Sequence, residues 1–154
     1  MKFKNMFSPI QIGPMTVKNR FVVPPMGNNF ANSDGTWSDE SVAYYGERAK
    51  GQFGLITIEA TVVHKGAKGG PKKPCLYDDN SIESLKKITD ACHEEGAKVS
   101  IQLQNAGPEG NAKNAGAPIQ AATAIASADE QGMRAVGAAL ELRVELGTQM
   151  EGAA

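Results

Sequence analysis

Small and amide-bearing residues follow three apolar segments of this sequence, where a ligand could meet bare backbone. Pro25-Met26-Gly27 follows the first segment, Glu59-Ala60-Thr61 follows the second, and the stretch from Gln102 to Gly107 ends the third. Glycine and alanine allow close approach to the backbone, and a glutamine amide both donates and accepts hydrogen bonds. These residue types suit a flat heteroaromatic ring with donors and acceptors along one edge. Ordinary strand-ending turns remain the alternative interpretation.

The apolar pattern predicts alternating strands and helices that position these residues. Residues 10–12 and 15–17 flank Gly13-Pro14 and indicate a small hairpin. Short buried strands are expected to begin near residues 21, 55 and 98. A helix is expected after the first strand, with Ser38 as N-cap and a stop at Lys50-Gly51.

A second helix is expected between the second and third strands. Asp79 is its candidate cap, and Gly96 is the residue that ends it. Its apolar stripe comprises Ile82, Leu85, Ile88 and Cys92.

This order of elements indicates an α/β fold with parallel strands. Strand-helix alternation is typical of βαβ units, and an eightfold barrel of such units needs roughly 250 residues. With 154 residues, the chain shows about three units of a partial (β/α)8 barrel after the hairpin. Ligands bind at the carboxyl ends of parallel strands, which is where the three candidate segments lie.

Composition excludes several classes of partner. The 16 basic and 17 acidic residues give a formal charge of -1, so neither nucleic acid nor an anionic membrane is an expected partner. The two cysteines, Cys75 and Cys92, have no metal-ligand spacing, and reduced packing thiols are expected. No segment resembles a signal peptide or membrane span, so a cytoplasmic protein is expected.

Other polar residues have two interpretations each. His64 could contact a substrate but is expected to be an exposed loop residue, and His93 is expected on a helix surface. Glu59 could be a buried acid near a ligand, but a carboxylate paired with a backbone or basic group is the expectation. Four lysines could attract a nucleotide phosphate, although a solvated loop is expected; they are Lys65, Lys68, Lys72 and Lys73.

Several motifs in order resemble a known family. "MFSPIQIG" leads to Asn19-Arg20, "PMG" follows at residues 25–27, and "YYGERAKGQFGLITIEAT" and "GAKVSIQLQNAG" come next. At these spacings, residues 3 to about 107 resemble the N-terminal part of the Old Yellow Enzyme family of FMN-dependent NADH:flavin oxidoreductases. The variant "PMGNNF" is similar to the branch of 2,4-dienoyl-CoA and enoate reductases.

The resemblance implies a TIM barrel with FMN across the carboxyl ends of its strands. Pro25, Met26 and Gly27 would line the flavin ring, and Gly27 would keep bulk away from its face. Ala60 would contact the ring, and the amide of Gln102 would pair with its pyrimidine edge. NAD(P)H as reductant and an activated alkene as substrate are implied as well. The alkene and the choice between NADH and NADPH stay open.

Departures from the family limit what is carried over. Asn105-Ala106-Gly107-Pro108 replaces a common His-Ala-Gly-Arg, and Asn28, Asn29 and Phe30 stand where some relatives carry a tyrosine. The family's substrate-orienting pair, His/Asn or His/His, and its phosphate loops follow the third strand in segments with no match here. No catalytic residue is therefore assigned, and no metal is expected.

The C-terminal tail differs from the family pattern. Residues 1–107 are expected to form the FMN-binding barrel portion, and 108–154 a divergent Ala/Gly-rich tail that is either irregular or helical. Residues 135–146 could form a helix by propensity, although the period of their apolar residues is mixed. From about residue 128 no similarity is recognised, which suggests a frameshift or truncation. The alternative function is a noncatalytic remnant or assembly module that self-associates or docks on a complementing chain through its open sheet edge.

Overall fold

The computed structural model of the chain describes residues 3–119. These residues form two units. The first comprises the chain up to residue 63 together with 72–104, and the second comprises 64–71 together with the residues from 105 onward. The five candidate flavin-binding residues belong to the first unit; they are Pro25, Met26, Gly27, Ala60 and Gln102.

The first unit begins with the expected hairpin. Strand β1 (Ile10–Ile12) pairs antiparallel with β2 (Met15–Val17), and Ile10 lies opposite Val17. Gly13, in the turn, has a φ of 55°, a backbone conformation that glycine adopts without steric cost. The predicted hairpin is confirmed.

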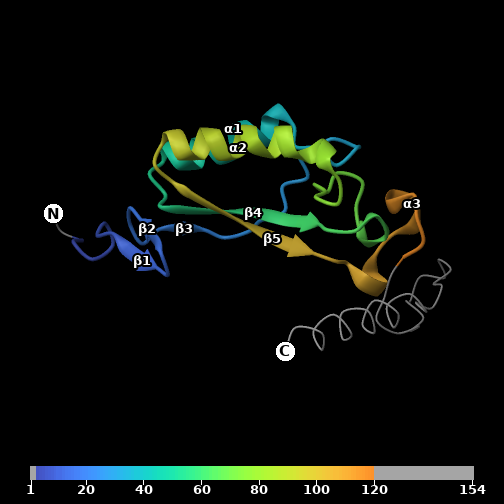
Figure 1. The fold of residues 1–154 in the computed structure, drawn as a ribbon, viewed down its shortest axis with the longest axis horizontal. Helices are drawn as coiled ribbons and strands as arrows, with labels where there is room; N and C mark the ends of the chain where they lie inside the picture. The colour runs from blue at the N-terminus through green and yellow to red at the C-terminus, as the bar shows by residue number, and fades with distance from the viewer. Residues whose placement is uncertain (1–2, 120–154) are drawn as a thin grey trace, which may run out of the picture. The chain divides into compact units, whose positions relative to one another are not determined.

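Three parallel strands form the sheet of this unit, in the order β3-β4-β5. Strand β3 (Val22–Val23) is short, whereas β4 (Leu55–Val62) and β5 (Lys98–Gln104) are longer. Val23 lies opposite Ile56, and Ile56 lies opposite Val99. Figure 1 shows the three strands side by side, with α1 and α2 on one side of them. The parallel α/β arrangement is confirmed, and the described strands form an open sheet and not a closed barrel.

Helix α1 (Asp39–Lys50) begins as the sequence predicts. The Ser38 hydroxyl accepts a hydrogen bond from the Ser41 N–H at 3.2 Å. Asp39 and Glu40 in the first turn complement the positive end of the helix dipole. Gly51 follows the helix as its C-cap.

Helix α2 (Ile82–Glu94) begins differently from the prediction. Asp79 is not its cap, because the chain enters the helix through a 3-10 turn, Asp79–Ser81. Asp78 caps that turn by accepting from the Asn80 N–H at 3.1 Å. Gly96, just after the helix, has a φ of 70°, which fits its predicted role as the stop.

The core lies between the two helices and the sheet. Ile88 and Cys92 of the predicted α2 stripe are buried, and Leu85 packs against the core. Ile82 is 57% exposed, contrary to the prediction, because it is the first residue of α2 and adjoins the 3-10 turn. The other buried members of the core are Val23, Trp37, Tyr45, Ala49, Ile56, Ile58 and Ala97.

The second unit contains short helical turns. They span Lys65–Ala67, Gly107–Glu109 and Ala112–Ala115. Two backbone bonds connect its segments, Ala106 N–H to the Ala67 carbonyl at 3.3 Å and Asn111 N–H to the Lys68 carbonyl at 3.1 Å. The expected helix at 135–146 lies outside the described residues, and the boundary at 107/108 stays a prediction. Within residues 3–119, no helix is long and apolar enough to cross a membrane.

Candidate functional site

An irregularity in β4 positions two of the candidate residues. Ile58 lies opposite Ile101 and Thr61 opposite Leu103, so Glu59 and Ala60 together oppose Gln102. Two residues against one is the pattern of a β-bulge, a feature that is common beside functional sites. Glu59, Ala60 and Thr61 therefore lie inside β4, and not after it as predicted from the sequence. The bulge brings Ala60 and Gln102 to the same level of neighbouring strands.

Side chains satisfy the peptide groups that the bulge removes from the ladder. The Glu59 N–H donates to the Tyr45 hydroxyl at 2.9 Å. The Thr61 hydroxyl donates to the Glu59 carbonyl at 2.8 Å. Tyr45 is 1% exposed, and burial raises the pKa of Tyr45 to about 12, so it is a neutral partner at physiological pH. The bulge is thus fixed from α1 and from β4 itself.

Gln102 lies on the sheet face that the helices leave uncovered. Ile101 and Val99 pack against the core, and successive residues of a strand point to opposite faces. Ser100, two residues before Gln102, bonds to Thr57 on β4 at 2.8 Å between the hydroxyl oxygens. Gln102 itself is exposed, so its amide is available to a ligand.

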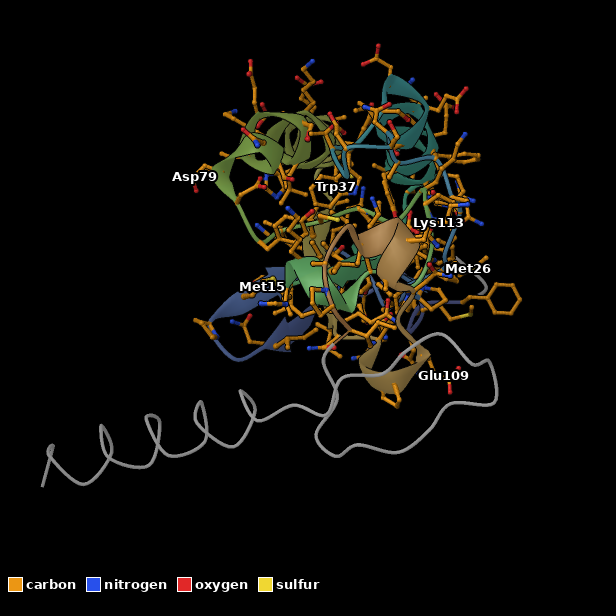
Figure 2. All side chains as sticks on the ribbon, turned by 90° about the vertical axis from the view of Figure 1, so that its right-hand side faces the viewer. Met15, Met26, Trp37, Asp79, Glu109 and Lys113 are labelled. Atoms are coloured by element: carbon orange, nitrogen blue, oxygen red, sulfur yellow. The ribbon has the colours of Figure 1, made fainter. Side chains whose placement is uncertain are left out.

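Pro25, Met26 and Gly27 follow β3 at the carboxyl end of the sheet. Pro25 is half-buried, while Met26 is 53% exposed and Gly27 is exposed. Figure 2 views the chain from the end toward which β4 points in Figure 1 and shows Met26 at the surface. Parallel pairing of β3, β4 and β5 brings all five candidate residues to this end of the sheet.

Gly27 lies in close contact with a charged pair. A Cβ at this position would be 2.9 Å from the Lys73 ammonium nitrogen and 3.7 Å from Glu59 Oε2. A side chain at Gly27 would therefore require the Lys73 ammonium to shift, a contact that sequence reasoning missed. Its expected contact with a flavin face stays a prediction.

Glu59 is the buried half of that pair. Its side chain is 0% exposed, and Oε2 accepts from the Asn28 N–H at 3.3 Å and lies 3.9 Å from the Lys73 ammonium. Burial raises the pKa of the Glu59 carboxyl, and the Asn28 N–H and Lys73 oppose that shift. Pairing of Glu59 with backbone and a basic group is confirmed. Two buried side-chain atoms, Glu59 Oε1 and Asn28 Nδ2, have no hydrogen-bond partner among the described residues.

The two histidines have the expected surface positions. His64 is exposed, and its Nδ1 accepts from the Gly66 N–H at 3.0 Å at the start of a 3-10 turn. His93 is exposed on α2. Cys75 and Cys92 are buried, as expected for packing residues. Within residues 3–119, no cluster of three or more potential metal-binding side chains occurs.

The four lysines do not form one solvated loop. Lys65 and Lys72 are exposed, as expected. Lys73 pairs with Glu59, and its side chain is 25% exposed. Lys68 is only 4% exposed, and its carbonyl accepts from the Asn111 N–H at 3.1 Å. The prediction of a solvated loop was wrong for Lys68 and Lys73.

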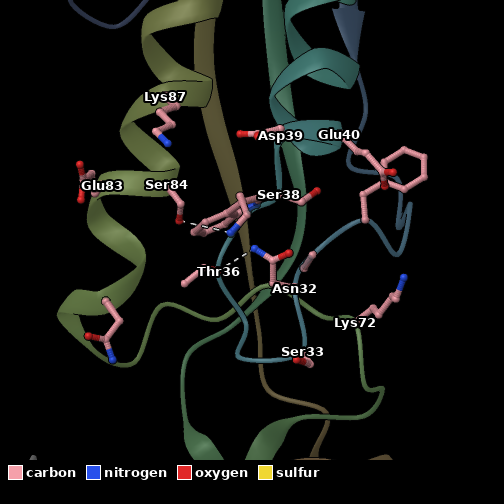
Figure 3. Close-up of a pocket in the computed structure, with 14 residues that line it drawn as sticks. Asn32, Ser33, Thr36, Ser38, Asp39, Glu40, Lys72, Glu83, Ser84 and Lys87 are labelled. Atoms are coloured by element: carbon pink, nitrogen blue, oxygen red, sulfur yellow. Dashed lines mark hydrogen bonds between the residues drawn. The ribbon is translucent and has the colours of Figure 1, made fainter.

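A surface pocket of about 780 Å³ lies at the beginnings of α1 and α2. Figure 3 shows Asp39, at the start of α1, pointing toward α2, and Ser84 and Lys87, on α2, pointing toward α1, whereas Glu40 and Glu83 point away from the other helix. The Trp37 N–H of the backbone donates to the Ser84 hydroxyl at 3.2 Å, which ties the two helix starts together. The pocket has charges of both signs and includes none of the five candidate residues.

A protein-family comparison matches most of the chain. The model of the NADH:flavin oxidoreductase / NADH oxidase family matches residues 5–142. This range includes all three strands of the sheet and all five candidate residues.

Solved structures of related enzymes have a similar fold. An Old Yellow Enzyme homologue from Zymomonas mobilis matches 91% of this chain with 27% identity and a TM-score of 0.75. Old Yellow Enzyme from Pichia sp. AKU4542 matches 79% with 34% identity and a TM-score of 0.73. Morphinone reductase, solved as an N189A mutant with tetrahydroNAD, matches 69% with 28% identity and a TM-score of 0.64. The chain spans 42%, 32% and 28% of these proteins, respectively.

Proposed function

The chain belongs to the NADH:flavin oxidoreductase / NADH oxidase family, and we propose that it forms part of the FMN site of an NAD(P)H-dependent ene-reductase. The bulge in β4 is the observation that carries this proposal. It sets Glu59 and Ala60 together opposite Gln102 on adjacent parallel strands. Parallel sheets bind ligands at this end of their strands.

The residues at this end suit a flavin ring. Gln102 is exposed, and its amide can donate to and accept from a pyrimidine edge in the same plane. Ala60 is half-buried and small, so the backbone of β4 can be approached closely. The exposed backbone at Gly27 offers a further surface without a side chain.

Each residue has a distinct proposed role. The chemistry that FMN supplies when bound is hydride transfer, here from NADH or NADPH to an activated alkene. Gln102 would hold the pyrimidine edge, and Pro25, Met26 and Gly27 would lie against the ring. The complex of morphinone reductase with tetrahydroNAD supports a nicotinamide as reductant. Residues 1–107 would then be the barrel portion that orients the cofactor.

Self-association or pairing with a complementing chain stays part of the proposal. Strands β3 and β5 are the outer strands of the described sheet. Val22 on β3 is 48% exposed and Leu103 on β5 is 63% exposed. Apolar side chains on open edges favour association with further strands.

A flavin titration tests the proposed function. Purified full-length chain is titrated with FMN while quenching of flavin fluorescence is followed. Gln102→Ala is expected to weaken binding about tenfold, because two neutral hydrogen bonds are together worth about 1–3 kcal/mol. Gln11→Ala is the matched control, since Gln11 lies in the hairpin and bonds locally to Gly13 and Thr16.

The outcomes separate clearly. Saturable binding that Gln102→Ala weakens and Gln11→Ala leaves unchanged supports the proposal. Equal affinity of all three proteins would refute the role of Gln102. Absence of FMN binding by folded wild-type chain would refute the flavin site altogether.

A further inference from the structure

Two opposite charges lie directly beneath the backbone turn that follows β3. The Glu59 carboxylate accepts from the Asn28 N–H at 3.3 Å. The Lys73 ammonium lies 3.9 Å from that carboxylate, and 2.9 Å from where a Cβ of Gly27 would be. Glu59 comes from the bulge in β4 and Lys73 from the segment after residue 71, so three separate pieces of chain meet at Gly27-Asn28.

The environment of Glu59 makes it a rigid support. Its side chain is 0% exposed, and its backbone N–H is held by Tyr45 at 2.9 Å. Oε2 makes its contacts with Asn28 and Lys73, whereas Oε1 has no hydrogen-bond partner among the described residues, so movement of the carboxylate would forfeit the contacts of Oε2. Its bond to the Asn28 N–H therefore holds the backbone at Asn28 next to β4.

The Lys73 ammonium occupies space next to Gly27 that a side chain at this position would contest. Gly27 does not have a positive φ, so its backbone conformation is open to other residues. The restriction is steric, since a methyl group would meet the ammonium nitrogen at 2.9 Å. The Lys73 side chain would have to move away from Glu59 to relieve that contact.

We propose that Glu59 and Lys73 are positioning residues of the flavin site, which hold the Gly27-Asn28 backbone in place and set the electrostatic potential at the ring that rests on it. This inference rests on the proposed function. Neither residue needs to touch the cofactor, because both act through the turn and through their charge. Charges in a partly buried site are weakly screened, so their field extends to a ligand on the neighbouring backbone.

Opposite charges predict opposite effects on the flavin. Lys73→Met removes the positive charge and is expected to lower the midpoint potential of bound FMN. Glu59→Gln removes the negative charge and is expected to raise it. Lys73→Arg retains the charge and is expected to stay close to wild type. The potentials are measured at pH 8 by reductive titration of the FMN-loaded full chain against a reference dye.

A double-mutant cycle tests the steric part. Gly27→Ala should displace Lys73, so it and Lys73→Met are each expected to weaken FMN binding by about threefold to tenfold. The double variant should be no weaker than either single one, because both changes remove the same contact. Additive losses would instead mean that Gly27 acts independently of Lys73, and would overturn the steric part.

Unchanged potentials, or shifts of the same sign for Lys73→Met and Glu59→Gln, would overturn the electrostatic part. Loss of packing alone gives no reason for shifts of opposite sign. Circular dichroism of each variant confirms that it is folded before its potential is measured.

A measurement without flavin separates this inference from the proposed function. The Asn28 amide is expected to exchange with solvent about fivefold faster in Glu59→Gln, because a neutral acceptor replaces a charged one. The Thr36 amide, which bonds to Asp34 at 2.9 Å, is the control and should not change. If the wild-type chain binds no FMN, the proposed function fails. The exchange rate of the Asn28 amide then tests by itself whether Glu59 supports the turn. An unchanged Asn28 rate would refute that support.

Discussion

Substitution of Tyr45 by phenylalanine tests how the bulge in β4 is held. The Tyr45 hydroxyl accepts from the Glu59 N–H at 2.9 Å, and both residues are buried. Because the ladder between Ile58 and Thr61 is interrupted, this N–H has the tyrosine as its partner in place of a neighbouring strand. Tyr45→Phe keeps the ring in the core and removes only the oxygen.

The expected cost follows from the group left behind. A buried N–H without an acceptor costs about 1–3 kcal/mol, so the free energy of unfolding should fall by that amount. Tyr44→Phe is the matched control. Tyr44 is half-buried next to Tyr45 on α1, and no hydrogen bond of its hydroxyl is found among the described residues. The free energy of unfolding of Tyr44→Phe should therefore fall by less than about 0.5 kcal/mol.

Alkaline pH gives a second test of the same contact. Burial raises the pKa of Tyr45 to about 12, above the ordinary value of 10.0, so the folded chain retains the proton longer than the unfolded chain. The stability that the protonated Tyr45 contributes is therefore fully present below pH 10 and is lost as the pH rises toward 12. Tyr45→Phe should show a shallower decline. Cys92 contributes to the decline that remains in this variant, because burial raises the pKa of its thiol to about 11.

Urea unfolding of wild type and both variants measures these differences. Trp37, the single tryptophan, is 3% exposed and reports unfolding through its fluorescence. Equal stabilities of Tyr45→Phe and Tyr44→Phe would refute the role assigned to the Tyr45 hydroxyl. A Tyr45→Phe chain with the same alkaline decline as wild type would refute the assignment of its titration.

Two further substitutions test packing and charge. Gly54→Ala should destabilise the chain by about 1–3 kcal/mol, because its Cβ would lie 2.8 Å from the Asn19 carbonyl oxygen and from Val17 Cγ1. Gly46→Ala, whose Cβ would meet Ala91 at an ordinary 3.7 Å, should instead stabilise α1 by about 0.5–1 kcal/mol, and urea unfolding that gave both variants the same sign would contradict this packing. Glu59→Gln should raise stability at pH 7, because burial raises the pKa of Glu59 and ionising it therefore costs stability above its ordinary value of 4.5. That gain should shrink as the pH falls toward 4.5, and a gain independent of pH would contradict the stated cause.

Local signals in the sequence were sufficient for most elements of the first unit. The cap Ser38 precedes α1, Gly96 follows α2, and Gly13-Pro14 marks the hairpin turn. Such signals act within a few residues, since a cap or a turn depends on backbone groups nearby in the chain. Asp79 shows their limit, because Asp78 one residue earlier offers the same carboxylate and the 3-10 turn selects it.

The candidate residues were found partly by residue type and partly by resemblance. Pro25, Met26, Gly27, Ala60 and Gln102 stand at matching positions of the family motifs. Their common location at one end of the sheet follows from the strand order that the apolar pattern predicts.

Only the tertiary structure decided what surrounds them. The bulge that places Glu59 and Ala60 opposite Gln102 depends on the register between strands, and nothing in β4 alone marks it. The contact of Gly27 with Lys73 joins residues 46 positions apart, so no local pattern could reveal it. The sequence by itself therefore determined the order of strands and helices, because short-range hydrogen bonding and apolar periodicity control it. Burial of Glu59, its pairing with Lys73 and the support of the turn needed distant segments to meet, and tertiary packing alone settles which charges become neighbours.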